Sequence, residues 1–372
     1  MFRVPVPALV LVGAATASTY VKAIRDAVNL HDIEHVVTVA LILILFDGGL
    51  QLGHRKFRDA AAPIVALGAA GTFATTALIA VAAHLGFGLD WKFSFVLGAA
   101  FAPTDPAVVF SLLANRTIAG RTPAILEGES GFNDPAGIAL LLGFVHLATH
   151  PHASIAAMFG TFAIAMVVGC AFGVVAGLAI RWVLHPRRPA LNAAQSVSAL
   201  AGIFALYAIA GLAHGSGFLA VFVAGIVLDE AAPPTNSALA RIQLNLPRLG
   251  ELVAFVMLGI TVDLHTLPTA RTWLIGLGLF ALLAFVIRPA VCAPLLAVLN
   301  RREAAFVAWA GLKGAVPMLL GVLAVSGGVP DAPRLLAIVF VVVVASIVVQ
   351  GGALPWVARK LRLEAKPNPA GG

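Results

Sequence analysis

The residues best suited to chemistry lie between positions 127 and 135, in the stretch Glu-Gly-Glu-Ser-Gly-Phe-Asn-Asp-Pro. At helical spacing Ser130 and Asp134 share one face, and Glu129 and Asn133 share the neighbouring face. A carboxylate, a hydroxyl and an amide oxygen held together suit a partly dehydrated monovalent cation, and they suit a proton equally well. A desolvated carboxylate that is ionised when it holds a cation and neutral when it holds a proton predicts exchange by competition for one site.

Two further ionisable residues stand where apolar segments should be broken. Pro103 and Pro106 flank Thr104 and Asp105, remove backbone donors and disfavour helix at the preceding residues. The stretch from 311 to 317, Gly-Leu-Lys-Gly-Ala-Val-Pro, should unwind for the same reason. Where two broken helices cross, half-helix N-termini attract an anion and C-termini a cation, so we expect Asp105 and Lys313 to compensate these dipoles.

Three more charged side chains need a role inside or beside apolar segments, because an ionisable group at the bilayer centre costs at least about 2.5 kcal/mol. We assign Glu129 to a structural ion pair with Arg288, which precedes Pro289, in preference to direct ion binding. Asp47, beside Gly48 and Gly49, is interpreted as a helix-end residue, with a vestibule residue facing the cytoplasm as the alternative.

The histidines and cysteines, which could bind a metal, give little indication of a metal site. His146, His150 and His152 have a spacing that could bind a metal, but no carboxylate accompanies them, so interface histidines are favoured. Cys170 and Cys292 both lie within apolar runs, which indicates neither a disulfide framework nor a metal cluster. We predict no cofactor, and no metal other than a transported monovalent cation.

The composition defines the class of protein. Of 372 residues, 60% are hydrophobic and only 11% are charged, whereas a globular domain carries roughly 25% charged residues. Apolar runs of about 20 residues, enough to cross a bilayer, recur along the chain. The net charge of +7 comes from basic residues at the ends of these runs, which argues against nucleic acid as a partner. The chain is predicted to be an all-α polytopic membrane protein in contact with lipid.

Charge, Gly and Pro divide the chain into twelve predicted membrane segments. They lie near 4–19, 33–52, 61–87, 93–113, 123–147, 155–184, 192–213, 216–229, 249–264, 272–299, 304–326 and 334–357. Seventeen of the 24 Lys and Arg residues fall on one side and five on the other, so the positive-inside rule places both termini in the cytoplasm. The first segment also has features of a secretory signal, which we consider the weaker interpretation.

Landmarks repeat along the chain at an offset of about 211 residues. Gly13 pairs with Gly225, Gly49 with Gly259, and Pro106 with Pro317. The shift equals seven segments, and an odd shift inverts the second copy across the membrane, as in many secondary transporters. The partner of segment 192–213 would precede residue 1, so about thirteen helices are expected in a complete protein. We predict a first inverted repeat at 1–147, a linking helix at 155–184, a second repeat at 192–357 and a short cytoplasmic tail at 358–372.

Five stretches together resemble the monovalent cation/proton antiporter family, the sodium or potassium/proton exchanger domain with an Asn-Asp pair. They are "LILFDGGL", "FAPTDPAVVF", "EGESGFNDP", "HGSGFLAVFVAGIVL" and "GLKGAVP", and the likeness covers essentially the whole chain. The family's inverted-repeat fold, with two crossed and broken transmembrane helices, agrees with the repeat described above.

The resemblance implies roles for individual residues. It makes Asp134 the carboxylate shared by cation and proton, with Asp105, Thr104 and Ser130 beside it. Asn133 stands where other branches of the superfamily carry a second Asp, so each cycle should trade one proton for one monovalent cation without net charge. The resemblance also implies the Glu129–Arg288 pair, a homodimer and elevator-like movement of a core domain in the plasma membrane. Many relatives have Arg at the position of Lys313.

Two other functions fit parts of the sequence. Gly128-Glu129-Ser130-Gly131 matches the G-x-S-G of intramembrane serine proteases, with His214 as base, but this leaves Asp105, Asp134, Lys313 and the repeat unexplained. A passive cation channel is the stronger rival, because buried carboxylates also line pores. The sequence does not distinguish Na⁺ from K⁺ or Li⁺.

Overall fold

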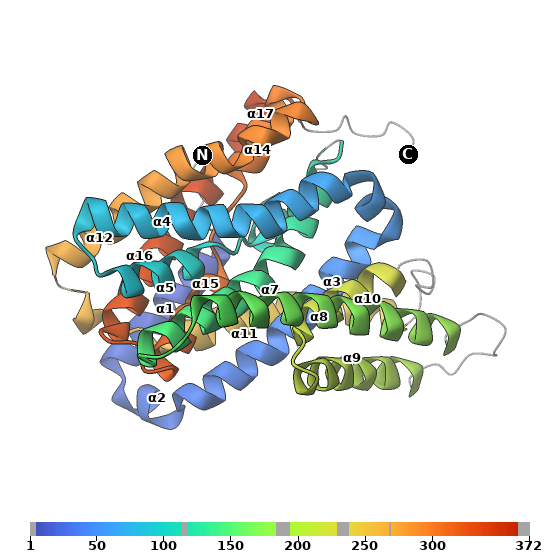
Figure 1. Cartoon of the computed structure of the whole chain (residues 1–372), viewed down its shortest axis with the longest axis horizontal. Helices are drawn as coiled ribbons and strands as arrows, with labels where there is room; N and C mark the ends of the chain where they lie inside the picture. The colour runs from blue at the N-terminus through green and yellow to red at the C-terminus, as the bar shows by residue number, and fades with distance from the viewer. Residues whose placement is uncertain are drawn as a thin grey trace.

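The computed structural model describes residues 5–113, 118, 120–183, 194–228, 238–267 and 269–363, and the regular elements within this part are helices. The first half contains α1 (Val6–Tyr20), α2 (Lys22–Ala27), α3 (Leu30–Val65), η1 (Ala66–Gly71), α4 (Thr72–Phe87), α5 (Trp91–Phe101), α6 (Pro106–Leu112), α7 (Thr122–Thr149) and α8 (Ile155–Val183). The second half contains α9 (Ala194–Leu212), α10 (Gly217–Leu228), α11 (Ala238–Ile260), η3 (Leu264–Thr266), α12 (Ala270–Leu282), η4 (Leu283–Ile287), α13 (Arg288–Cys292), η5 (Ala293–Ala297), α14 (Arg301–Trp309), α15 (Ala315–Ser326), α16 (Ala332–Ala345), η6 (Ser346–Gly351) and α17 (Gly352–Lys360). Figure 1 shows their arrangement.

The all-α membrane architecture predicted from the sequence is confirmed. Within the described residues, five continuous helical stretches are long and apolar enough to cross a membrane, or six if the bent pair α5–α6 is one span. Shorter apolar helices of 10–17 residues, α15 among them, complete the bundle. Each of the twelve predicted segments falls on one helix or on a run of two to four consecutive helical elements, apart from end residues that lie outside the described part.

The connection after the second predicted segment differs from expectation. We expected a loop between 52 and 61, but a second helical stretch follows directly after Gly53 and runs to Val65. Gly53 has non-helical dihedral angles (φ 63°, ψ 165°), which are cheap for glycine, so it ends the first helical stretch of α3 and turns the chain into the second. Asp47 lies within two turns of the end of that first stretch, and its interpretation as a helix-end residue stays a prediction.

Glycines let the two halves approach closely at two equivalent places. A Cβ added to Gly49 of α3 would lie 2.3 Å from the carbonyl oxygen of Phe222 in α10. A Cβ added to Gly259 of α11 would lie 2.6 Å from the carbonyl oxygen of Leu11 in α1. Because Gly49 and Gly259 were matched by the repeat, the α3–α10 and α11–α1 contacts are the pair that an inverted duplication produces.

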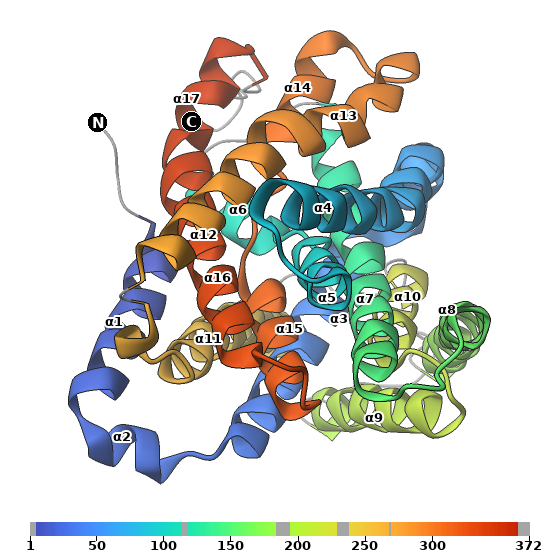
Figure 2. The same ribbon diagram turned by 60° about the vertical axis from the view of Figure 1, so that its left-hand side comes forward.

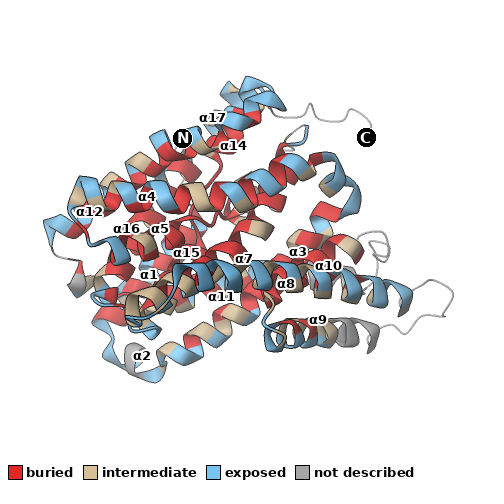
Figure 3. Ribbon diagram, in the orientation of Figure 1, coloured by how far each residue is buried: buried red, intermediate tan, exposed pale blue. Residues whose placement is uncertain are grey.

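A row of glycines on α8 packs this helix against the bundle. Gly169, Gly173 and Gly177 follow one face at four-residue spacing and meet Ser216 and helix α10, the close packing that small residues permit in membranes. The opposite face of α8 exposes large apolar side chains such as Val167, Val175 and Trp182. Figure 3 shows this exposed surface of α8 against the largely buried α15 and α16.

The predicted domain boundaries remain predictions. Helix α8 occupies the place of the linking helix, and α17 reaches Lys360 of the predicted tail. Residues 364–372 of that tail lie outside the described residues, as do Arg3, Arg116, Arg187, Arg188 and Lys366, on which the predicted orientation partly rests.

Candidate cation and proton site

The two predicted helix breaks face each other in the middle of the molecule. Helices α5 and α6 are separated at 102–105 and bend by 43°, and α14 and α15 are separated at 310–314. The backbone amide of Asp105 donates to the carbonyl oxygen of Leu312 at 2.9 Å, which joins the two breaks directly. Figure 2 shows α5 and α15 side by side at this crossing, so the expectation of two crossed, broken helices is confirmed.

The carboxylate of Asp105 serves the N-termini of both half-helices. Its Oδ1 accepts from the amide of Val108 at 3.3 Å, in the first turn of α6. Its Oδ2 accepts from the amide of Ala315 at 3.2 Å, the first residue of α15. Because the first amides of a helix have no partner inside it, one carboxylate between two N-termini satisfies donors and compensates both dipoles.

Lys313 lies at the C-terminal end of α5, whereas Asp105 lies at the N-termini of α6 and α15. Lys313 is 1% exposed, and its Nζ donates to the carbonyl oxygens of Pro103 at 2.7 Å and Ala102 at 3.3 Å. These carbonyls follow the last turn of α5, where a cation is favourable. Behind Lys313, its own amide donates to Ser346 Oγ, which donates in turn to Gln350 Oε1.

Helix α7 presents a polar face to the first break. Asn133 Nδ2 donates to Thr104 Oγ1 at 2.9 Å, and Asn133 Oδ1 accepts from the amide of Thr104 at 3.3 Å. Ser130 Oγ lies 2.8 Å from the carbonyl oxygen of Thr104 and 3.1 Å from Asp134 Oδ2. The five residues predicted to form the site, which also include Asp105, are therefore gathered around one helix break.

Asp134 is the least satisfied member of this group. Its side chain is 5% exposed, and its Oδ1 is buried with no hydrogen-bond partner among the described residues. A buried carboxylate oxygen without a partner is costly unless a proton or a cation completes it.

Glu129 and Arg288 form a buried ion pair next to the second break, where a Cβ added to Gly311 would lie 2.2 Å from Arg288 Nε. Arg288 Nη1 lies 2.5 Å from Glu129 Oε1, and Nη2 lies 2.7 Å from Oε2. Nη2 also donates to the carbonyl oxygen of Val307 in α14 at 3.4 Å. The bidentate geometry is the strong form of a guanidinium–carboxylate contact, and it connects α7 to α13 and α14.

A cavity of about 50 Å³ reaches Asp134 and Asp105 from one side. It also exposes Glu127 and Glu251, two carboxylates for which the sequence analysis proposed no role. Glu251 stands at the start of the apolar run 249–264, where a charged side chain is as unusual as Asp105 and Lys313 are in their own segments. Glu127 belongs to the acidic stretch 127–135, and its spacing of seven residues from Asp134 places both on one face of α7.

The other residues singled out from the sequence do not line this cavity. Asp47 accepts a hydrogen bond from Gln51 within α3 and does not line the described cavity. His214 lies between α9 and α10 with a φ of 59° and makes no hydrogen bond to Ser130 among the described contacts. The rings of His146 and His150 pack 4.2 Å apart at the end of α7. Cys170 and Cys292 are free thiols.

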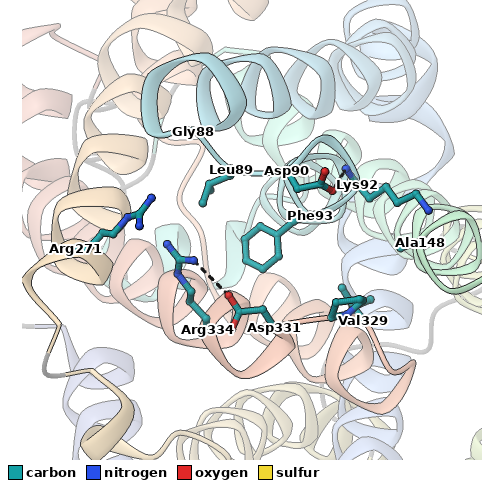
Figure 4. Close-up of a pocket in the computed structure, with 11 residues that line it drawn as sticks. Gly88, Leu89, Asp90, Lys92, Phe93, Ala148, Arg271, Val329, Asp331 and Arg334 are labelled. Atoms are coloured by element: carbon teal, nitrogen blue, oxygen red, sulfur yellow. Dashed lines mark hydrogen bonds and ion pairs between the residues drawn. The ribbon is translucent and has the colours of Figure 1, made fainter.

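A second cavity, of about 280 Å³, lies at the start of α5 and α16 and at the end of α7. It shares no lining residue with the first cavity. Figure 4 shows Lys92, Arg271 and Arg334 around it, with Arg334 bonded to Asp331 at 3.3 Å. Three of the five basic residues counted on the less basic side of the membrane therefore meet here. On α7 the first cavity lies along the N-terminal half of the helix and the second at its C-terminal end.

Comparison with known proteins identifies the family. The sequence model described as "Sodium/hydrogen exchanger, transmembrane" matches residues 2–360. The chain belongs to this family of secondary transporters, as the broken helices and the buried polar site indicated.

Relatives with curated names are antiporters. The K⁺/H⁺ antiporter NhaP of Alkalimonas amylolytica is 33% identical over 339 residues, which cover 88% of this chain and 57% of that protein. The Na⁺/H⁺ antiporter NhaH of Halobacillus aidingensis is 27% identical over 96% of this chain and 91% of that protein. The chain thus spans a little over half the length of the K⁺/H⁺ antiporters that it matches.

A solved structure has the same fold. The sodium proton antiporter MjNhaP1 from Methanocaldococcus jannaschii aligns with a TM-score of 0.76 over 94% of this chain and 93% of that one. The sequence identity of 20% limits this likeness to the fold.

Proposed function

We propose that this chain exchanges protons for monovalent cations, Na⁺ or K⁺, by competition at the carboxylate of Asp134. In this proposal Ser130, Thr104, Asn133 and Asp105 shape the binding site, and alternating access delivers the site to each side in turn. Support comes from the family, from relatives named as Na⁺/H⁺ and K⁺/H⁺ antiporters, and above all from the unpartnered Oδ1 of the buried Asp134.

The position of Ser130 supplies a physical reason for competition. A hydroxyl has one proton, yet Ser130 Oγ lies within hydrogen-bond distance of both the Thr104 carbonyl and Asp134 Oδ2. When Asp134 carries a proton, it can donate to Ser130, and Ser130 donates to Thr104. When Asp134 is ionised, the hydroxyl turns toward it or a cation takes the free lone pairs, so proton and cation use the same oxygens.

The neighbouring charges favour a one-for-one exchange. Asp105 is held by two backbone amides and Lys313 by two backbone carbonyls, while Glu129 is paired with Arg288. Among these charged groups, Asp134 is the one whose carboxylate can exchange a bound proton for a bound cation. An exchange of one proton for one monovalent cation moves no net charge. We further propose that the protein works as a homodimer in the plasma membrane with its C-terminus in the cytoplasm.

An assay in proteoliposomes tests the proposal. Purified chain is reconstituted with a pH-sensitive dye inside, Na⁺ or K⁺ is added outside, and the internal pH is followed with and without a clamped membrane potential. We expect internal alkalinisation at a rate independent of the clamp. A cation channel would instead require a compensating current and would respond to the clamp.

Two substitutions make the assay specific. Asp134→Asn preserves size and removes the exchangeable charge, so exchange should fall to the level of empty liposomes. Asp331→Asn removes a carboxylate beside the second cavity, outside the site, and should leave the rate unchanged. Exchange by Asp134→Asn at the wild-type rate would overturn the proposal.

A further inference from the structure

The cavity beside Asp134 holds more negative charge than the exchange site itself requires. Asp105 of α6, Glu127 and Asp134 of α7, and Glu251 of α11 all line it, and its described lining residues include no Lys, Arg or His. Four carboxylates around one small cavity repel one another unless protons or cations occupy the space between them.

Two of these carboxylates have buried oxygens that lack partners. Oδ1 of Asp134 and Oε1 of Glu251 are both inaccessible and make no hydrogen bond to any described residue. Of the other two, Asp105 accepts two backbone amides, and Glu127 is half-buried, as Glu251 is. Unpaired carboxylate oxygens in one cavity are the arrangement that a passing proton or cation would complete.

Helices α7 and α11 bring Glu127 and Glu251 to the cavity that reaches Asp134. Glu127 precedes Asp134 by seven residues on α7, which is about 10 Å along a helix axis. Glu251 follows the exposed Arg248 by less than one turn of α11. The positive-inside count places Arg248 on the cytoplasmic side, and Glu251 is within one turn of it.

The cavity wall beside Asp134 leaves little other room. The ring of Phe222 from α10 packs on Gly131, where an added Cβ would lie 2.0 Å from the ring. Phe222 is 1% exposed and lines the cavity on the side of α10. An ion in a cavity of about 50 Å³ is within reach of the acidic side chains that share its lining.

We propose that Glu251 is a relay residue on the cytoplasmic access path, which binds the proton or the monovalent cation transiently on its way to and from Asp134. This inference rests on the proposed function. The step breaks no covalent bond other than O–H: a proton leaves one carboxyl group, crosses by water and is accepted by the other carboxylate, or a cation moves between them. Asp105, Glu127 and Asp134 face Glu251 across the cavity, and Arg248 lies on its own helix.

Vesicles of defined sidedness test this role. In everted vesicles the cation reaches the protein from the cytoplasmic side, and in right-side-out vesicles from the other. For Glu251→Gln we expect the half-saturating cation concentration to rise roughly fivefold in everted vesicles, because a nearby unit charge changes cation affinity by about that factor in a partly hydrated site. We expect no change in right-side-out vesicles, and Glu251→Asp should restore most of the cytoplasmic affinity.

The controls separate a relay from a structural role. Asp331→Asn, which removes a carboxylate beside the second cavity, should behave as wild type in both kinds of vesicle. An equal effect of Glu251→Gln on both sides, or no effect on either side, would overturn the proposal while wild-type exchange stays intact. Loss of the wild-type exchange signal itself would instead refute the proposed function.

A chemical measurement gives a second readout that does not depend on transport. Dicyclohexylcarbodiimide modifies protonated carboxyl groups in apolar surroundings, and mass spectrometry locates the adduct. We expect Glu251 in the full chain to be modified, and millimolar Na⁺ or K⁺ to protect it. Modification that neither cation reduces would contradict cation binding at Glu251.

Discussion

Asp105 and Lys313 hold each other's helices across the crossing. Asp105 Oδ2 accepts from the amide of Ala315, two residues after Lys313, at 3.2 Å. Lys313 Nζ donates to the carbonyl oxygen of Pro103, two residues before Asp105, at 2.7 Å. Each charge thus compensates backbone groups of the opposite broken segment, so neither break can shift without disturbing both.

Gly314 tests how tightly this arrangement is fixed. A Cβ at this position would lie 1.8 Å from Asp105 Oδ2, so Gly314→Ala must displace the carboxylate or the N-terminus of α15. We expect the exchange rate in proteoliposomes to fall at least tenfold while the chain still inserts. Gly13→Ala is the matched control, because no atom lies within 4 Å of the added carbon. A wild-type rate for Gly314→Ala would show that the Asp105 cap is dispensable.

The buried ion pair predicts a large loss of stability when one partner is neutralised. Glu129→Gln leaves the guanidinium of Arg288, which is 4% exposed, without its counter-charge. Breaking such a pair costs about 3–5 kcal/mol. We expect a marked fall in the unfolding temperature of the detergent-solubilised protein, measured by intrinsic fluorescence.

An exposed pair provides the comparison for this prediction. Arg58 and Asp59 lie 3.8 Å apart with side chains 71% and 64% exposed, and surface pairs contribute about 0–1 kcal/mol. Asp59→Asn should therefore leave the unfolding temperature nearly unchanged. Replacing Glu129 and Arg288 together by Met should recover part of the loss, and a double variant as unstable as Glu129→Gln would argue against an uncompensated charge as the cause.

Neighbouring glycines of α3 should respond differently to the same substitution. Gly49→Ala places a carbon 2.3 Å from a backbone oxygen of α10, whereas Gly48→Ala meets no atom within 4 Å. Overpacking costs about 1–3 kcal/mol, while Gly→Ala at an open helical position gains roughly 0.5–1 kcal/mol. Thermal unfolding should thus show Gly49→Ala destabilised and Gly48→Ala unchanged or stabilised, and the reverse order would contradict the close α3–α10 contact.

Most of the fold could be predicted from the sequence, because the length of an apolar run and the positions of helix-breaking residues act locally. Pro103, Pro106, Gly311 and Gly314 fix the two breaks whatever surrounds them, and the repeated landmarks imply the crossing. The helical stretch that follows Gly53 was missed because the polar residues between 54 and 59 are compatible with both a loop and a helix. Only the packing of α3 against its neighbours decides between them.

The site was predictable where residues lie on one helix and less so where helices meet. Spacing alone places Ser130 and Asp134 on one face of α7. The approach of Glu251 to the same cavity depends on how α11 packs against α3 and α15, which the local sequence does not encode. Similarly, Ser346 and Gln350 look like ordinary polar residues of a membrane helix until the fold sets them behind Lys313.

Lys313 provides the sharpest test of whether charge or shape maintains the crossing. Lys313→Met retains an unbranched side chain but leaves the carbonyls of Ala102 and Pro103 without their donor, at a cost of about 1–3 kcal/mol. Lys313→Arg keeps the charge and adds donors, so it should be close to wild type in unfolding temperature and in exchange rate. If the charges of Asp105 and Lys313 maintain the crossing together, the double variant Asp105→Asn, Lys313→Met should lose less stability than the sum of the losses in the two single variants. Such non-additivity is expected because both residues act on the same crossing. Strict additivity in thermal unfolding would show instead that the two caps work independently.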